Sequence, residues 1–198
     1  MPDLTTADNS IYKPTGLTNT KFSVRNSTIL FETQNRNEYK SSEVTFAARF
    51  NSEYRGKNDN EVSVRWSIDK HSGDNIVKCF DVGYNITTGK TRIRYEHQHP
   101  DYTDVLAVGG TQGIPLSTDS FSEFKFVKLD YWDRTTLFQV FQKIDESGWT
   151  ELFNYMDKDH YVDEYPTGAQ IAIKVKDYTD NVILKDITVA EIEERVSI

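Results

Sequence analysis

Apolar and polar residues alternate with a period of two in almost every patterned segment of this chain of 198 residues. The alternation runs through residues 44–50, 62–68, 80–86 and 171–175. Successive side chains of a β-strand point to opposite faces of a sheet, so this period predicts strands with one buried and one polar face. Runs of β-branched and aromatic residues predict further strands near residues 20–33, 121–131, 134–144, 149–155 and 181–193.

Turn-forming residues separate these segments, and no segment has the convincing 3.6-residue period of an amphipathic helix. Residues 80–86 and 91–98, joined through residues 87–90, predict a hairpin. Many strands with regular turns predict an all-β fold, a two-sheet antiparallel β-sandwich (jelly roll) with little or no helix. We expect residues 11–198 to form this single domain and the polar residues 1–10 to be a disordered segment.

The chain is acidic, with a net charge of −8 and a pI near 5.0, which argues against nucleic acid as a partner. No apolar run approaches the roughly 20 residues of a membrane span, so no membrane insertion is expected. The N-terminus shows no signal peptide. The protein is therefore expected outside the cell or at its surface only if a leader was removed, and in the cytoplasm otherwise. The oligomeric state is left open.

The single cysteine and the three tryptophans can be assigned from their neighbours. Cys79 can form no intrachain disulfide, and its apolar surroundings predict a buried structural thiol. Trp66 and Trp149 are predicted to pack in the core. Trp132 lies at a predicted turn and is the better candidate for an exposed ring that stacks on sugar.

Residues 90–102 hold the densest set of functional residue types in the chain. Alternation sorts this segment into a polar face with Arg92, Arg94, Glu96 and Gln98, and an opposite face with Ile93, Tyr95 and His97. Two cations, a carboxylate and an amide on one strand face predict a binding surface. The alternative is an ordinary solvated face whose cations pair with nearby carboxylates such as Glu96 and Asp69.

Other predicted strands place cations on their polar faces as well: Arg49, Arg65, Lys174 and Lys176. If several of these strands adjoin in one sheet, an acidic protein would carry a locally basic groove. Arginine forks pair at two points with carboxylate or sulfate groups, which suits uronic acids and sulfated sugars.

The last third of the chain carries motifs of a known superfamily. Residues 138–144, Gly148–Leu152, 171–176 and 181–189 resemble the closing strands of concanavalin A-like lectin/glucanase jelly rolls of the LamG-like type. Residues 71–84 and the Arg94–Pro100 segment are similar to jelly-roll domains of this kind that have no secure activity. The resemblance implies a jelly roll in which one sheet presents a concave outer face, where sugars typically lie.

The main functional prediction is thus a lectin-like domain that binds a polysaccharide, with an anionic polymer the best chemical match, on its concave sheet. The candidate substrate-binding residues are Arg65, Arg92, Arg94, Glu96, Gln98 and Trp132. A structural or adhesion domain that meets another protein is a further alternative.

An enzyme of the same fold, a polysaccharide lyase or glycoside hydrolase, is the second interpretation. Its candidate catalytic residues are His71, Glu96, His99 and Tyr102, because these side chains can transfer protons. The resemblance implies an E-x-D-x-x-E strand for a glucanase, which is missing from the sequence. It implies R-x-E-x-R for an alginate-type lyase, and residues 92–96 depart from that spacing.

Metal binding has weak support in the sequence. No HExxH motif is present, and the His-x-His at residues 97–99 alone is a weak signal. The acidic runs at 157–159 and 177–180 form no recognised calcium loop. We therefore predict no metal site and no cofactor, with calcium, which is common in such jelly rolls, as the one ion to consider.

Overall fold

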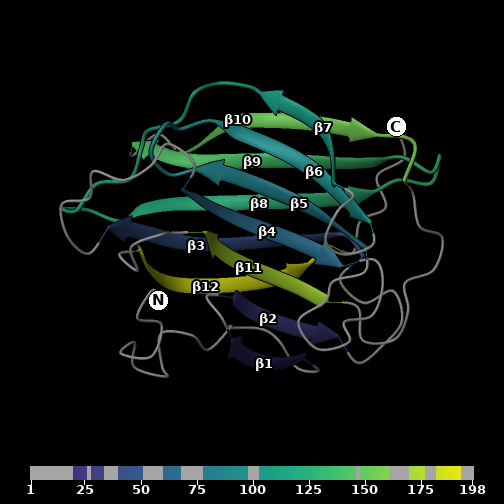
Figure 1. The fold of residues 1–198 in the computed structure, drawn as a ribbon, viewed down its shortest axis with the longest axis horizontal. Coiled ribbons are helices and arrows are strands. Elements are labelled where there is room, and N and C mark those ends of the chain that lie inside the picture. The colour runs from purple at the N-terminus through teal and green to yellow at the C-terminus, as the bar shows by residue number, and fades with distance from the viewer. Residues whose placement is uncertain are drawn as a thin grey trace.

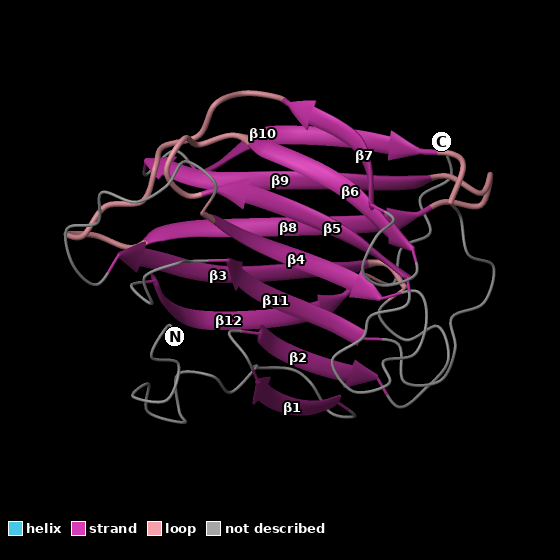
Figure 2. Cartoon of the chain, in the orientation of Figure 1, coloured by secondary structure: helices cyan, strands magenta, loops and turns pink. Residues whose placement is uncertain are grey.

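The computed structural model describes residues 20–25, 28–33, 40–50, 60–67, 78–97, 103–145, 148–160, 170–176 and 182–192. Within these ranges the chain forms twelve strands and no helix, as Figure 2 shows. The all-β prediction is therefore confirmed. No helix in this part of the chain is long and apolar enough to cross a membrane.

The strands form two antiparallel sheets that lie one behind the other (Figure 1). The larger sheet has seven strands in the order β1 (Thr20–Arg25), β2 (Thr28–Thr33), β11 (Gln170–Lys176), β4 (Glu61–Ser67), β5 (Lys78–Asn85), β6 (Thr91–His97) and β7 (Thr103–Gly109). The smaller sheet has five strands in the order β10 (Gly148–Asp157), β9 (Thr136–Asp145), β8 (Ser122–Asp130), β3 (Ser42–Phe50) and β12 (Val182–Glu191).

The hydrophobic core lies between the sheets and is rich in aromatic rings. Phe80 of the seven-stranded sheet packs against Phe138 of the five-stranded sheet, with ring centroids 4.6 Å apart. Phe46 stacks on Phe126 at 5.6 Å, and Trp66 is 2% exposed. Because one face of each central strand fills this core, the alternate residues of the same strands form the two outer faces of the sandwich.

Most strand predictions are confirmed, including the hairpin, which is β5 paired with β6. Residues 20–33 form a pair of strands, β1 and β2, where the sequence indicated one region. Strand β7 was not predicted. Its pairing with β6 shifts register between Ile93 and Arg94, and Val105 and Val108 are both exposed, so its sequence lacks regular alternation.

Two of the three single-residue burial predictions hold. Cys79 and Trp66 are buried, as expected. The prediction for Trp149 was wrong, because its ring is 40% exposed. The β10–β9 register shifts between Gly148 and Trp149, and such an irregularity changes which face a side chain meets. Residues 1–10 lie outside the described residues, and the single-domain prediction stays a prediction.

Candidate functional site

The outer face of the seven-stranded sheet carries a row of charged side chains across the neighbouring strands β4, β5 and β6. The inward residues of β4 and β5, such as Val64 and Val82, belong to the core, so the residues beside them point outward. The strand register places Arg65 opposite Asp81 and Asp81 opposite Arg94. One carboxylate therefore stands between two guanidinium groups on neighbouring strands.

Asp81 is the centre of this charged cluster. Its Oδ2 lies 2.6 Å from Nη2 of Arg65 and 2.9 Å from Nη2 of Arg94. Asp81 is completely buried. Burial opposes its ionisation, but the attraction of three guanidinium groups is stronger and lowers the pKa of Asp81. The same pairing raises the pKa of Arg65 against the opposing effect of its burial.

A second pair lies one step along the sheet, where Glu61 of β4 reaches Arg92 of β6 across β5. Arg92 makes a two-point pair with Glu61: its Nε donates a hydrogen bond to Oε2 and its Nη2 donates one of 2.6 Å to Oε1. The Glu61 side chain passes over Gly83 of β5. A Cβ atom on Gly83 would lie 2.7 Å from Glu61 Oε2 and closer still to the carboxyl carbon. Glycine therefore makes room for this bridge.

The surroundings of Glu61 disfavour its charged form, whereas those of Asp81 favour the charged form. Burial is the largest influence and raises the pKa of Glu61, and repulsion from Asp81 acts in the same direction. The hydrogen bond from Arg92 only partly offsets these effects. Nη2 of Arg94 lies 3.6 Å from Glu61 Oε1, so Arg94 links the two carboxylates.

Glu96 closes the cluster at the end of β6. Its Oε1 accepts a hydrogen bond of 3.0 Å from Nη2 of Arg65 and lies 3.7 Å from Nη2 of Arg94. The buried thiol of Cys79 points to Oε2 at 3.7 Å, and burial raises the pKa of that thiol well above its usual range. Lys174 of β11 is half-buried nearby, and burial together with repulsion from Arg65 lowers its pKa.

The cluster has a buried base and an accessible rim. The side chains of Arg65 and Asp81 are 10% and 0% exposed, whereas those of Arg92, Arg94 and Glu96 are 24%, 21% and 23% exposed. Any molecule that lies on this face would meet the rim residues. The base residues hold the rim residues in place.

Some polar atoms of the cluster are buried without a hydrogen-bond partner in the described structure: Nε of Arg65, Oδ1 of Asp81 and Nε of Arg94. Most buried polar groups in folded proteins are paired, so an unpaired group needs a reason. A site that sacrifices some stability to hold several arginines together is one such reason.

The structure brings together four of the predicted site residues: Arg65, Arg92, Arg94 and Glu96. Gln98, His71, His99 and Tyr102 lie outside the described residues. Trp132 lies in the turn between β8 and β9, on the other sheet, and is 65% exposed. Arg49 also belongs to the other sheet, so it does not join the predicted basic groove.

Sequence reasoning missed the carboxylates that organise the cluster. Asp81 could have been found from the predicted hairpin, because a register set by the turn at 87–90 places it across from Arg94. The role of Glu61 could not be predicted from its neighbours in the sequence, because it depends on β4 lying beside β5.

The acidic run at 157–159 does not form a metal site. In the described part of the chain, no group of three or more His, Cys, Asp or Glu residues is arranged to hold a metal ion. Oδ2 of Asp157 instead accepts a hydrogen bond of 2.9 Å from the backbone N–H of His160. Its Oδ1 lies 3.0 Å from Nδ1 of the His160 ring. This local turn explains the burial of Asp157 without a cation.

Comparisons with known proteins identify the fold. No protein-family model and no curated protein matches the sequence. Among solved structures, an endo-β-1,4-glucuronan lyase from the fungus Trichoderma reesei is similar, with a TM-score of 0.53 and 11% identity over 92% of this chain and 79% of that chain.

The VIP36 exoplasmic/lumenal domain in its Ca2+/Man3GlcNAc-bound form has a TM-score of 0.52 and 9% identity, over 88% of this chain and 85% of that chain. A legume lectin-like domain from Entamoeba histolytica has a TM-score of 0.51 and 7% identity, over 88% of each chain. These likenesses show the fold, a β-sandwich shared with lectin-like and glucuronan lyase structures, as the sequence resemblance implied.

Proposed function

We propose that this protein binds an acidic polysaccharide of the uronate class on the outer face of its seven-stranded sheet. The observation that carries the proposal is the convergence of Arg65, Arg92 and Arg94 around two buried carboxylates. Arg92 and Arg94 are the primary contacts, and Glu96 accepts hydrogen bonds from sugar hydroxyl groups.

The internal carboxylates fit this role because they hold the guanidinium groups before a ligand arrives. Each guanidinium has five N–H donors, and the pairs with Glu61 and Asp81 use only some of them. The side chains of Arg92 and Arg94 are 24% and 21% exposed, so they can offer donors to a ligand, although Nε of Arg94 is buried. Binding to a surface that is already ordered loses less conformational entropy than ordering free arginine side chains.

The cluster also concentrates positive charge in an acidic protein. It holds four cations, with Lys174, against the three carboxylates of Glu61, Asp81 and Glu96, while the chain as a whole carries −8. An anionic polymer would be repelled by the rest of the surface and attracted here. One fold neighbour is a glucuronan lyase, which supports glucuronate polymers as the first ligand to test.

Titration calorimetry with a soluble β-1,4-glucuronate oligomer tests the proposal. We expect Arg94→Ala and Arg94→Lys to bind about tenfold more weakly or worse, because lysine keeps the charge but loses the two-point fork. Lys90→Ala is the matched control, since it removes one exposed cation from the β5–β6 turn of the same sheet. Thermal unfolding verifies that the Arg94 variants remain folded.

Equal affinity in the wild type, Arg94→Ala and Lys90→Ala would overturn the proposal, as would no binding to any uronate polymer. The same mixtures, followed by ultraviolet absorbance and by a reducing-end assay, separate binding from catalysis. A lyase produces unsaturated ends that absorb in the ultraviolet, a hydrolase produces reducing ends, and a binding domain produces neither.

A further inference from the structure

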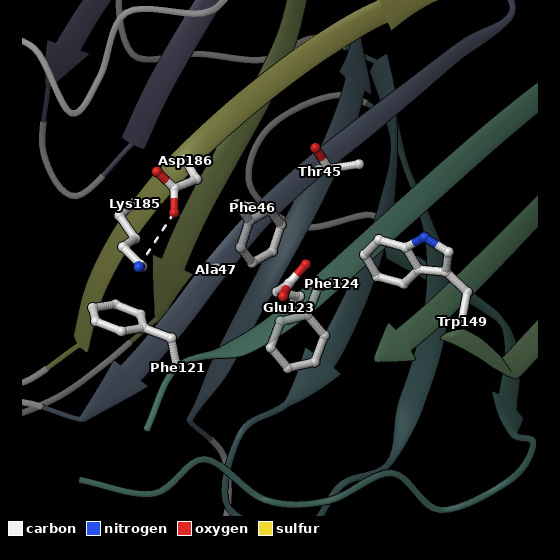
Figure 3. Close-up of a pocket in the computed structure, with 9 residues that line it drawn as sticks. All are labelled: Thr45, Phe46, Ala47, Phe121, Glu123, Phe124, Trp149, Lys185 and Asp186. Atoms are coloured by element: carbon white, nitrogen blue, oxygen red, sulfur yellow. Dashed lines mark ion pairs between the residues drawn. The ribbon is translucent and has the colours of Figure 1, made fainter. Parts of the chain in front are cut away.

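The opposite outer face, on the five-stranded sheet, contains a pocket of about 390 Å³. Its wall is formed by Phe121, Glu123, Trp149, Lys185 and Asp186, and its floor by β3 at Thr45 and Ala47 (Figure 3). We propose that this pocket is a second and separate ligand site, which binds a neutral hexopyranose unit of a glycan.

Two aromatic rings flank the pocket. Figure 3 shows Phe121 and Trp149 on opposite sides, with Glu123 between them. Trp149 is 40% exposed although it belongs to a strand. Sugars present faces of C–H groups that pack against such rings, while their hydroxyl groups need polar partners at the edge. The floor residues Thr45 and Ala47 are small, which leaves space between the rings.

Cations fix the orientation of both rings. The ammonium group of Lys185 lies 4.4 Å from the centre of the Phe121 ring, and that of Lys125 lies 5.0 Å from the centre of the Trp149 ring. The guanidinium of Arg49 lies 5.0 Å from the Phe121 ring. These contacts set the two ring planes before a ligand enters.

Asp186 stands at an unusual point of β12 in the pocket wall. Its φ is 53°, in the left-handed region that residues other than glycine seldom adopt. The β12–β3 register shifts between Lys185 and Thr188, so Asp186 lies in a β-bulge. Bulges re-aim side chains and are frequent beside functional sites, and an outlier in φ is a reason to look for one. The Asp186 side chain is 74% exposed and thus available as a hydrogen-bond acceptor.

Each of the two carboxylates in the pocket wall has a lysine partner. Lys185 pairs with Asp186 at 3.3 Å, and Glu123 pairs with Lys143 of β9 at 3.3 Å. Acceptors and donors thus stand side by side, as hydroxyl groups require. The pocket adds two aromatic rings, which the charged cluster of the other sheet does not contain, so the two faces differ in the ligand that they favour.

The test uses an array of neutral gluco-, manno- and galacto-oligosaccharides, followed by titration of the best binder with the full chain. We expect Trp149→Ala to weaken binding about tenfold or more and Asp186→Asn to weaken it less. Asparagine keeps the size and tolerates the left-handed backbone, so that variant should fold normally. Ile114→Ala is the matched control, because it removes an exposed apolar side chain from the loop between β7 and β8, away from the pocket.

The site is refuted if no neutral oligosaccharide on the array binds, or if Trp149→Ala binds as well as the wild type. Its outcome is independent of the acidic-polysaccharide site. Arg94→Ala should leave neutral-sugar binding unchanged, and Trp149→Ala should leave glucuronate binding unchanged. Competition between the two ligands would contradict the separation of the sites.

Discussion

The two outer faces of this sandwich are built from the same kind of alternating strand, but they differ in the burial of their carboxylates. On the seven-stranded sheet, Asp81 and Glu61 are 0% and 5% exposed and are surrounded by arginines. On the five-stranded sheet, Glu123 and Asp186 have side chains 49% and 74% exposed, and each has one lysine partner. Charge on the first face is therefore expected to support the fold, while charge on the second face should contribute little to stability.

The largest effect should come from the centre of the charged cluster. Asp81→Asn removes the carboxylate that pairs with Arg65 and Arg94 and leaves two guanidinium groups without their buried counter-charge. We expect the free energy of unfolding to fall by about 3–5 kcal/mol, since removing one partner of a buried pair leaves an uncompensated charge. Urea denaturation measures this change.

Glu123→Gln is the matched variant on the other face, and its effect should be within about 0.5 kcal/mol. Equal effects in Asp81→Asn and Glu123→Gln would break the distinction between a charge that supports the fold and one that contributes little to stability.

Acidic pH should reduce the difference in stability between the wild type and Asp81→Asn. The pKa of Asp81 is lowered in the folded state, so its contribution to stability is present above its ordinary value of 3.8 and is lost as the pH falls through the lower folded pKa. The gap in unfolding free energy between the wild type and Asp81→Asn should thus be full near pH 7 and shrink as the pH falls below 3.8 through the lower folded pKa. Denaturation curves at a series of pH values measure the gap. A gap that widens below the ordinary pKa would show that Asp81 is not held as the anion.

A smaller loss of unfolding free energy should follow when the Glu61–Arg92 pair above Gly83 is disturbed. Gly83→Ala introduces a Cβ where the Glu61 carboxylate lies, so the carboxylate must move away from Arg92. We expect a loss of about 1–3 kcal/mol, the cost of a disturbed buried hydrogen bond to a charged group. A double-mutant cycle makes the cause visible. In a Glu61→Ala background the clash is gone, and Gly83→Ala should then be neutral or stabilising. The same loss in both backgrounds would rule out the clash as the cause.

Alternation alone predicted much of the first face. The parity of residues 92–96 placed Arg92, Arg94 and Glu96 outward and Ile93 in the core, as the structure has them. Parity fails where a strand is irregular. Trp149 lies at a register shift and faces solvent, and β7 is joined to β6 through another shift.

What parity cannot supply is the identity of neighbouring strands. The ion pair between Glu61 and Arg92 can form only because β4, β5 and β6 lie side by side. That strand order is set by packing across the whole sandwich. The pocket on the five-stranded sheet draws on β12, β3, β8 and β10, which are far apart in the chain. The sequence resemblance covered residues 181–189, which include Lys185 and Asp186, but only the three-dimensional arrangement places Phe121 and Trp149 beside them.

A small change in stability is also expected at Asp186, and it sharpens the contrast between the faces. Asp186→Gly removes a side chain that is 74% exposed and suits the left-handed backbone at φ 53°. Relief of strain in the folded state opposes the greater freedom of glycine in the unfolded chain, so the unfolding free energy should change by less than about 1 kcal/mol. Denaturation of Asp186→Gly beside Asp81→Asn measures both carboxylates on one scale. A loss at Asp186 as large as that at Asp81 would mean that the bulge carboxylate supports the fold, and it would leave Glu123 as the pocket carboxylate available for a ligand.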